Sequence, residues 1–130
     1  LAEAAVRLAG TLVADMLAGH AERCKSSPAF VRAYCATMAG WMEQSEFRSG
    51  CPIATTMLET APTSRKLTAA GNAAIDCWIG IVAGVFERDG LSRARSRAKA
   101  QTLIASIEGA LLLARMRQAT KPILDVALMI

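Results

Sequence analysis

The sequence lacks the residue groupings that most catalytic and metal sites require. It has one histidine, His20, and four cysteines, and no two cysteines have C-x-x-C spacing, which argues against a usual zinc site. No glycine-rich phosphate loop occurs. Three acids, Glu43, Glu46 and Glu59, lie in charged or junction segments where nothing requires them to meet. We therefore expect no enzyme, no metal and no cofactor.

Aromatic residues make up only 5% of the chain and strand patterns are missing, whereas alanine, leucine, methionine and arginine are abundant. This composition favours helices. The cysteines, at positions 24, 35, 51 and 77, mostly lie in or beside apolar helical patterns, where a free thiol acts as a small hydrophobic group. Free thiols fit a reducing cytoplasm, and a disulfide stays open as the alternative.

Long uncharged runs are also missing. The longest, 33–42 and 77–86, are about half the roughly 20 residues that a membrane span needs. The first residues, with Glu3 and Arg7 in an amphipathic pattern, do not resemble a signal peptide. Leu1 falls inside a helical pattern, so we expect further residues before it in the whole protein.

The net charge is only +4, and the basic residues form two clusters, at 93–99 and 115–121. Neither cluster has an aromatic residue or a glycine among its basic residues, as a nucleic-acid surface often has. We interpret both clusters as solvated helix ends.

Apolar residues make up 53% of the chain and recur at helical spacing along most of it. The spacing predicts six helices, over 2–23, 28–46, 52–60, 63–89, 93–117 and 122–130. The breaks between them carry start and stop residues: Ser27 as an N-cap before Pro28, Gly50 before Pro52, the Ala61–Thr63 break with Thr63 or Ser64 as a cap, and Gly90 as a stop. The predicted fold class is all-α.

Two segments stand out within this pattern. The helix over 28–46 carries a stripe of methionine and aromatic residues, which is either ordinary core or the wall of a pocket for an apolar ligand. On the next long helix, Asp76 interrupts an apolar surface; we favour a solvent-facing position over a pocket carboxylate that would attract a cation. The segment Ala94–Ile130 predicts two apolar helices that need a partner, and a second copy of the chain is our preferred one. There, Glu108 is either solvated or paired with Arg115 or Arg117.

Two stretches carry a resemblance to a known family. FRSGCPIATTMLE (Phe47–Glu59) and IEGALLLARMRQATKPILDVA (Ile107–Ala127) resemble segments of the C-terminal domain of TetR-family transcriptional repressors. The resemblance covers nearly all of the chain. It implies an all-α bundle whose last two long helices pair with those of a second copy as a four-helix bundle, and whose other helices enclose a pocket for a small, often apolar, inducer.

The same resemblance implies a division of labour in the whole protein. Residues 1–130 would be one ligand-binding and dimerisation domain, and residues 1–24 would be the remainder of a helix linking it to an N-terminal helix-turn-helix domain that binds operator DNA. Inducer binding would shift the dimer out of its DNA-binding form. The alternative from a different class is a helical protein-interaction module without a small-molecule site.

The candidate site residues form two groups. The predicted pocket consists of large, soft side chains converging from four helices: Met16, Phe30, Tyr34, Met38, Trp41, Met57, Cys77, Trp78 and Ile81. The predicted dimer interface has Gly109 as its point of closest approach and consists of Leu103, Ile107, Gly109, Ala110, Leu111, Ala114, Ile123, Val126 and Ile130.

Overall fold

A computed structural model describes residues 1–60 and 63–130, and within these ranges the chain forms six α-helices and no strand. The predicted all-α class is confirmed, and the predicted helix boundaries agree within two residues. Ala61 and Pro62, which belong to the predicted break before the fourth helix, lie outside the described residues. The helices are α1 (Ala2–Arg23), α2 (Ser27–Gln44), α3 (Pro52–Thr60), α4 (Arg65–Arg88), α5 (Arg93–Arg117) and α6 (Lys121–Met129).

Serine side chains cap three of the helices. The Ser26 hydroxyl accepts a hydrogen bond from the Ala29 amide at 3.3 Å, so the N-cap of α2 is Ser26 and the predicted cap Ser27 is wrong by one residue. The helix can begin one residue earlier because the amide that Pro28 lacks would have no partner in the first turn in any case. Ser64 caps α4, one of the two predicted alternatives, and Gly90 follows α4 with φ of 99°.

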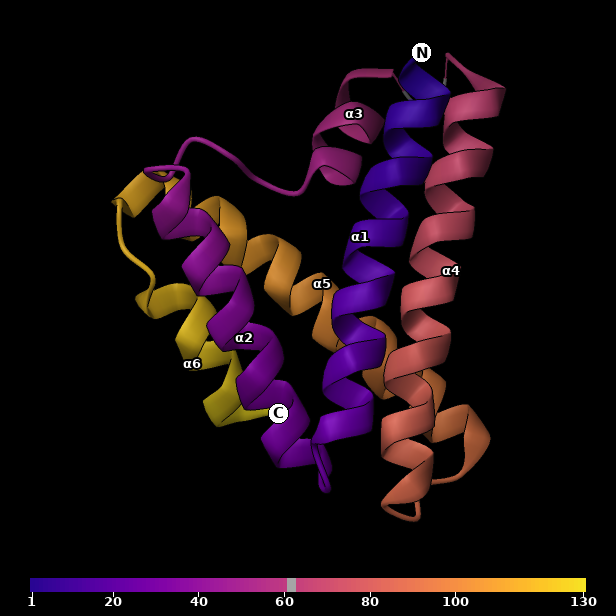
Figure 1. Cartoon of the computed structure of the whole chain (residues 1–130), viewed down its shortest axis with the longest axis vertical. Coiled ribbons are helices and arrows are strands. Elements are labelled where there is room, and N and C mark those ends of the chain that lie inside the picture. The colour runs from indigo at the N-terminus through magenta and orange to yellow at the C-terminus, as the bar shows by residue number, and fades with distance from the viewer. Residues whose placement is uncertain (61–62) are drawn as a thin grey trace.

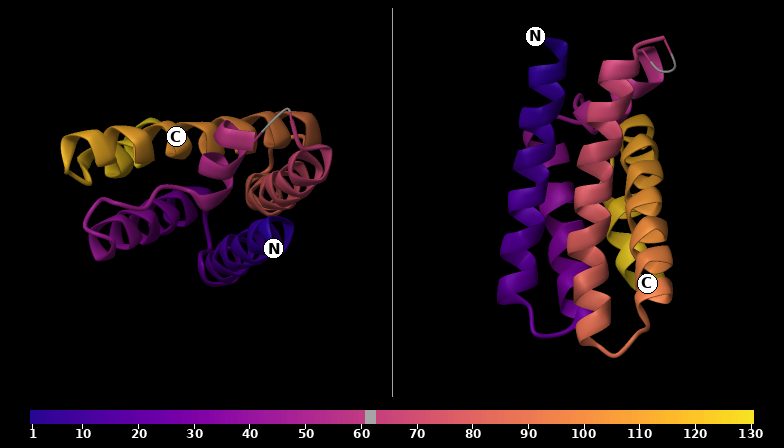
Figure 2. Two further views of the ribbon diagram at one scale, coloured as in Figure 1. Left: turned by 90° about the horizontal axis from the view of Figure 1, so that it is seen from above. Right: turned by 90° about the vertical axis from the view of Figure 1, so that its right-hand side faces the viewer.

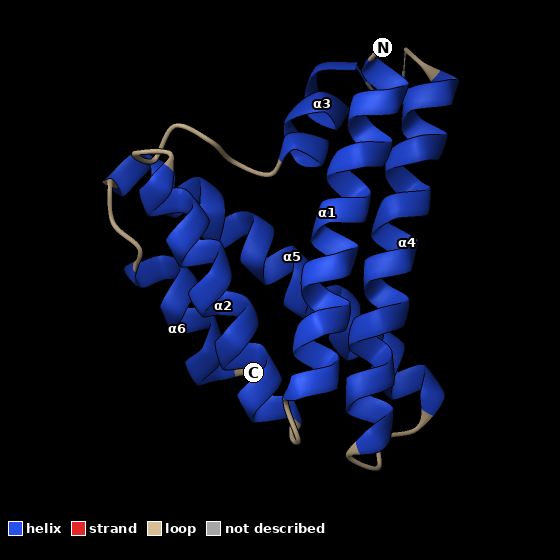
Figure 3. Cartoon of the chain, viewed as in Figure 1, coloured by secondary structure: helices blue, strands red, loops and turns tan. Residues whose placement is uncertain are grey.

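The helices are arranged in two layers (Figures 1 and 2). Helices α1 and α4 lie side by side and run in the same direction, while α2 turns back and diverges from α1. Helices α5 and α6 form the second layer, with α6 packed on α2 and α5. Helix α3 packs on the first halves of α1 and α4. All the elements in the described ranges are helices joined by short connections (Figure 3).

Close backbone approach holds α1 to α4. A Cβ atom built on Gly10 would lie 2.8 Å from the Cβ of Ala74, so only glycine allows this separation. At the far end of the pair, the Arg88 guanidinium donates hydrogen bonds to the carbonyl oxygens of Ala21 and Cys24, at 2.7 and 3.1 Å. Helix α1 packs far more extensively on α4 than on α2, although α2 follows it directly in the chain.

One hydrophobic core joins all six helices. Its largest fully buried side chains include Trp78 and Phe86 of α4 and Tyr34 of α2. Among the described residues, α4 alone is long and apolar enough to cross a membrane by length and composition. Its second half contains the uncharged run 77–86, and in this fold it packs against α1 and α5 as a core helix does.

Candidate ligand pocket

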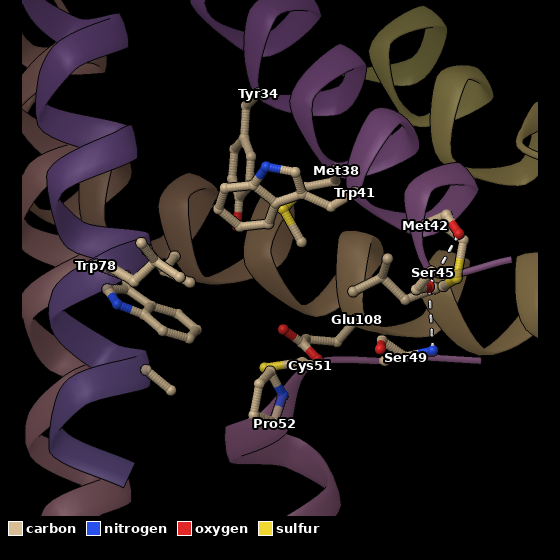
Figure 4. A pocket seen from close by; sticks show the side chains of 15 residues that line it. Tyr34, Met38, Trp41, Met42, Ser45, Ser49, Cys51, Pro52, Trp78 and Glu108 are labelled. Carbon is tan, nitrogen blue, oxygen red and sulfur yellow. Dashed lines mark hydrogen bonds between the residues drawn. The ribbon is translucent and has the colours of Figure 1, made fainter. Parts of the chain in front are cut away.

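A cavity of about 230 Å³ lies where α1 and α2 diverge (Figure 4). Its volume is slightly below the range of about 300–1,000 Å³ that is usual for small-molecule sites. Five helices and the connection between α2 and α3 contribute to its wall, which is mostly apolar. The lining residues are Ala9, Leu12, Val13, Tyr34, Met38, Trp41, Met42, Ser45, Ser49, Gly50, Cys51, Pro52, Trp78, Glu108 and Leu111.

The turn that ends α2 helps to make room for this cavity. Glu46 and Phe47 both have positive φ, 55° and 60°, and the Phe47 amide donates to the Met42 carbonyl at 2.9 Å. Two consecutive non-glycine residues in this left-handed backbone region cost about 1–3 kcal/mol each. The apolar spacing of the sequence does not predict such a turn. The chain then crosses the gap between α2 and α1 as an extended segment and enters α3 at Pro52.

Two tryptophans form opposite parts of the wall. Trp78 is buried, and its indole N–H donates a hydrogen bond of 3.0 Å to the carbonyl oxygen of Gly10 on α1. The polar edge of Trp78 is therefore satisfied, and its ring serves as an apolar wall. Trp41 is half-buried, and its ring faces the cavity from α2 above Met38 (Figure 4).

Glu108 brings the only carboxyl group in this wall. It reaches the cavity from α5 and lies beside Cys51 (Figure 4), and none of the ion pairs among the described residues includes it. Burial raises the pKa of the Glu108 carboxyl above its usual range, and the Cys51 thiol partly offsets this rise. This partial burial argues against the solvated alternative for Glu108, while a pair with Arg115 or Arg117 across an interface stays a prediction.

The neighbouring acidic groups stay neutral near Glu108. Burial, with a further contribution from the Glu108 charge, raises the pKa of the Cys51 thiol to about 12. Burial and the same carboxylate also raise the pKa of Tyr34. A thiol that holds its proton so firmly is a poor nucleophile, so this arrangement is suited to binding rather than covalent chemistry.

The structure brings together four of the nine predicted pocket residues: Tyr34, Met38, Trp41 and Trp78. The other five do not line the cavity. Phe30 lies fully in the core, Met16 and Ile81 pack partly buried against it, Met57 contacts Gly71, and Cys77 is exposed in a groove between α1 and α4. Cys77 directly precedes Trp78 on α4, and because adjacent helical residues point about 100° apart, the two side chains face different surroundings.

Sequence reasoning missed most of the remaining lining residues, above all Glu108 and Cys51. Gly50, Cys51 and Pro52 lie in the stretch that carries the family resemblance, which was the one available signal for that part of the wall. Leu111 was assigned to the interface and instead lines the cavity. Nothing in the sequence places Glu108 next to Cys51, because 57 residues separate them and only the tertiary fold joins α5 to the start of α3.

The predicted interface residues require a correction. Leu103, Ile107, Ala110, Leu111, Ala114, Ile123 and Val126 are buried within the chain's own core, Gly109 is exposed, and Ile130 is half-buried. The seven buried residues have at most 9% of their surface exposed, which leaves little for a partner to contact. Helix α5 is apolar around most of its circumference near residues 103–116, so spacing alone could not show which side faces its own chain.

A different set of residues leaves apolar surface uncovered on the second layer. A Cβ atom added at Gly109 would meet nothing within 4 Å, so the folded chain itself does not need glycine there. We call the following set the outer face: Gly109, Leu112, Leu113 and Met116 of α5, with Leu124 and Leu128 of α6, all exposed.

His20, Asp76 and the cysteines do not line the cavity, with the exception of Cys51. The His20 ring shares a hydrogen bond of 2.8 Å with the Thr37 hydroxyl, and the Arg23 guanidinium contacts its other nitrogen at 3.2 Å. Burial lowers the pKa of His20. Asp76 is exposed, as the solvent-facing interpretation predicted, and all four cysteines are free. Over residues 1–60 and 63–130, no group of three or more His, Cys, Asp or Glu side chains is placed to hold a metal.

Comparisons with known proteins agree with the fold. The family model described as the C-terminal domain of LmrA/YxaF-like transcriptional regulators matches residues 28–129. Two relatives, from two strains of Mycobacterium tuberculosis and both named as uncharacterized HTH-type transcriptional regulators, are 32% identical over 84 residues. These matches cover 61% of this chain but only 43% of each relative. The chain belongs to the TetR family of transcriptional regulators, as a C-terminal domain of the LmrA/YxaF-like type.

Proposed function

We propose that this domain binds a small, largely apolar effector in the cavity and that binding shifts a dimeric repressor out of its DNA-binding form. The observation that carries the proposal is the cavity itself, because Tyr34, Met38, Trp41 and Trp78 leave space between them instead of packing solidly. A helical interaction module would have no need for such a space. Membership of a regulator family supports the same conclusion.

Helix α1 is the proposed route from the cavity to DNA. It contributes Ala9, Leu12 and Val13 to the wall, and Trp78 holds the Gly10 carbonyl directly beside them. Because α1 is fastened to α4 and only loosely packed on α2, a ligand between α1 and α2 favours one setting of α1 over another. In the whole protein, residues 1–24 would link this domain to a preceding helix-turn-helix domain, as the relatives' names suggest.

The outer face is the proposed dimer surface. Its exposed leucines and methionine form apolar surface on two neighbouring helices, and exposed apolar patches of this kind mark association sites. A two-fold homodimer would bring α5 and α6 of each copy together as four helices. The interface hypothesis therefore keeps Gly109, and its other proposed residues are now the exposed ones of α5 and α6. A DNA-binding regulator of this kind works in the cytoplasm.

Ligand titration of the tryptophan emission tests the pocket. We expect members of a panel of apolar and aromatic compounds to change the emission, since Trp41 and Trp78 line the cavity. Filling the cavity with Ala9→Leu should weaken binding by about tenfold or more, because the ligand and the added carbons compete for the same space. The matched control is Ala5→Leu, at an exposed position on the same helix, which should leave binding unchanged.

Two outcomes would contradict the proposal. An emission spectrum that ignores the whole panel would leave only the interaction module, with the outer face as its binding surface. Equal binding by Ala9→Leu and the unmodified chain would show that the ligand sits elsewhere. In the full-length protein, an effector from the panel should also release the protein's promoter DNA.

A further inference from the structure

We propose that the effector is a lipophilic cation, with Glu108 as its counter-charge and the rings of Trp41 and Trp78 as its aromatic walls. This inference rests on the proposed function of the pocket and adds the chemical class of its ligand. The sequence suggested a pocket carboxylate only as the less favoured alternative for Asp76, and Asp76 is exposed. The inference assigns that role to Glu108 instead.

The charges around the cavity favour one sign. Of its 15 lining residues, Glu108 is the single one with a carboxyl group, and no lysine, arginine or histidine accompanies it. The Ser45 hydroxyl is occupied, because it donates to the Met42 carbonyl at 3.0 Å and accepts from the Ser49 amide at 3.2 Å. The Ser49 hydroxyl is uncharged and gives the cavity no positive group. An anionic ligand would therefore meet a carboxylate and no positive group.

The aromatic walls suit a cation as well. The indole N–H of Trp78 is engaged by Gly10, so what this residue offers a ligand is its ring. Figure 4 shows the Glu108 carboxyl between Cys51 and the space bounded by the Trp41 and Trp78 rings. Tryptophan is the best side chain for holding a cation against a ring face, and a carboxylate beside two such rings supplies the compensating charge.

A neutral ligand would leave the cost of burying Glu108 in place, whereas a cation removes it. The carboxyl lies at the border between the cavity and a shallow groove between α3 and α5, which Gly50, Cys51, Glu108 and Leu111 also line. This border gives a charged ligand a route from solvent to the carboxylate. The cavity volume of about 230 Å³ limits the buried part to a small body, such as one substituted aromatic ring.

Three probes of similar shape and different charge test the inference. They are phenyltrimethylammonium, its neutral isostere tert-butylbenzene, and benzenesulfonate, each titrated into the domain and followed by NMR. At neutral pH we expect the ammonium to bind at least about tenfold more tightly than tert-butylbenzene, and benzenesulfonate to bind weakest. Glu108→Gln, which keeps the shape of the side chain, should remove most of the difference between the cation and the neutral probe.

Glu59→Gln is the matched control, because Glu59 is an exposed acid lining the adjoining groove and not the cavity. It should leave all three affinities unchanged. Acidification should weaken binding of the ammonium alone, as Glu108 gains its proton, and this pH dependence should vanish in Glu108→Gln. The other groups facing Glu108 do not produce it: Cys51 and Tyr34 are neutral over this range, and Arg115 of the groove keeps its charge.

The outcomes separate the two proposals. Binding of tert-butylbenzene as tight as that of the ammonium would overturn the cation inference and leave the pocket standing. An equal loss for both probes in Glu108→Gln would show a structural role and also overturn it. Binding by none of the three probes would count against both the cation and the pocket.

Discussion

The two sides of α5 are similar in composition and opposite in environment. Ile107 on the inner side has 0% of its surface exposed, while Leu112 and Met116 on the outer side have 60% and 71% exposed. The inner side packs on α4 and α6, whereas no part of the described chain covers the outer side. The difference shows that an apolar helix surface indicates burial without telling whether its own chain or a partner provides it.

The border between these two sides carries the pocket. Glu108 and Leu111 line the cavity, and the next residues along the helix, Gly109 and Leu112, belong to the outer face. A ligand contact and a proposed subunit contact thus lie within one turn of one rigid helix. This proximity gives a direct physical means for an effector to alter how two copies are set against each other.

The largest effect should come from the inner side. Ile107→Ala removes a fully buried side chain and leaves a cavity, so we expect a loss of about 2–5 kcal/mol in the free energy of unfolding. Urea denaturation measures it, and the loss should not depend on protein concentration. The matched change on the outer side is Leu113→Ala, which should lower the free energy of unfolding by less. Because a dimer would stabilise the folded chain, this smaller loss should increase with protein concentration if dimers form. Equal losses would abolish the distinction between the two sides.

A smaller effect on folding and a large one on assembly should follow from Leu112→Glu. The exposed position tolerates the charge in the free protomer, with a change in stability within about 0.5 kcal/mol. In a dimer built on the outer face the charge would be buried, so the dissociation constant should rise by at least about tenfold. Sedimentation equilibrium at micromolar concentration measures it.

The control for this experiment is Leu8→Glu, the same change at a leucine of α1 that is 73% exposed. It should leave the dissociation constant unchanged. Gly109→Leu sharpens the test, because a Cβ added at this exposed position meets nothing within 4 Å in the protomer, so we expect a loss of affinity to come from the partner. An unmodified chain that stays monomeric in these measurements would contradict the proposed dimer.

The helices could be predicted from the sequence because their signals are local. Apolar spacing of three and four residues, Pro28, Ser64 and Gly90 each act within one or two turns, and the structure agrees with them within two residues. The same locality explains part of the pocket prediction. Tyr34, Met38 and Trp41 follow each other at spacings of four and three, so one helix face presents them together.

The rest depends on which helices meet, and that is not a local property. The run Leu111–Leu113 points apolar groups in three directions, and the sequence does not say which of them meets α4, the cavity or solvent. The sharp turn at Glu46 and Phe47 contains no glycine from which it could be predicted, although it directs the chain to the cavity. Glu108 is a single acid in an apolar segment, and its position beside Cys51 arises only when the folded chain brings the segment before α3 next to α5.

The smallest effect concerns this carboxyl and has a predictable sign. Burial raises the pKa of Glu108 in the folded chain above its ordinary value of 4.5, so the folded state holds the proton more firmly than the unfolded state. Stability from this group is then fully present below pH 4.5 and is lost as the pH rises through the higher folded pKa. Above the raised folded pKa the unmodified chain therefore carries the cost of a partly buried charge.

Glu108→Gln should remove that cost and raise the free energy of unfolding at neutral pH, by on the order of 1 kcal/mol. The gain should shrink as the pH falls through the raised folded pKa and should be gone below pH 4.5, where both chains are neutral at this position. Thermal unfolding at several pH values measures it, with the exposed Glu59→Gln as control. A gain that does not change with pH would mean that packing rather than charge decides the stability at this site. A loss at neutral pH would mean that Glu108 is stabilised by its surroundings, and a group that is already compensated has little need of a cationic ligand.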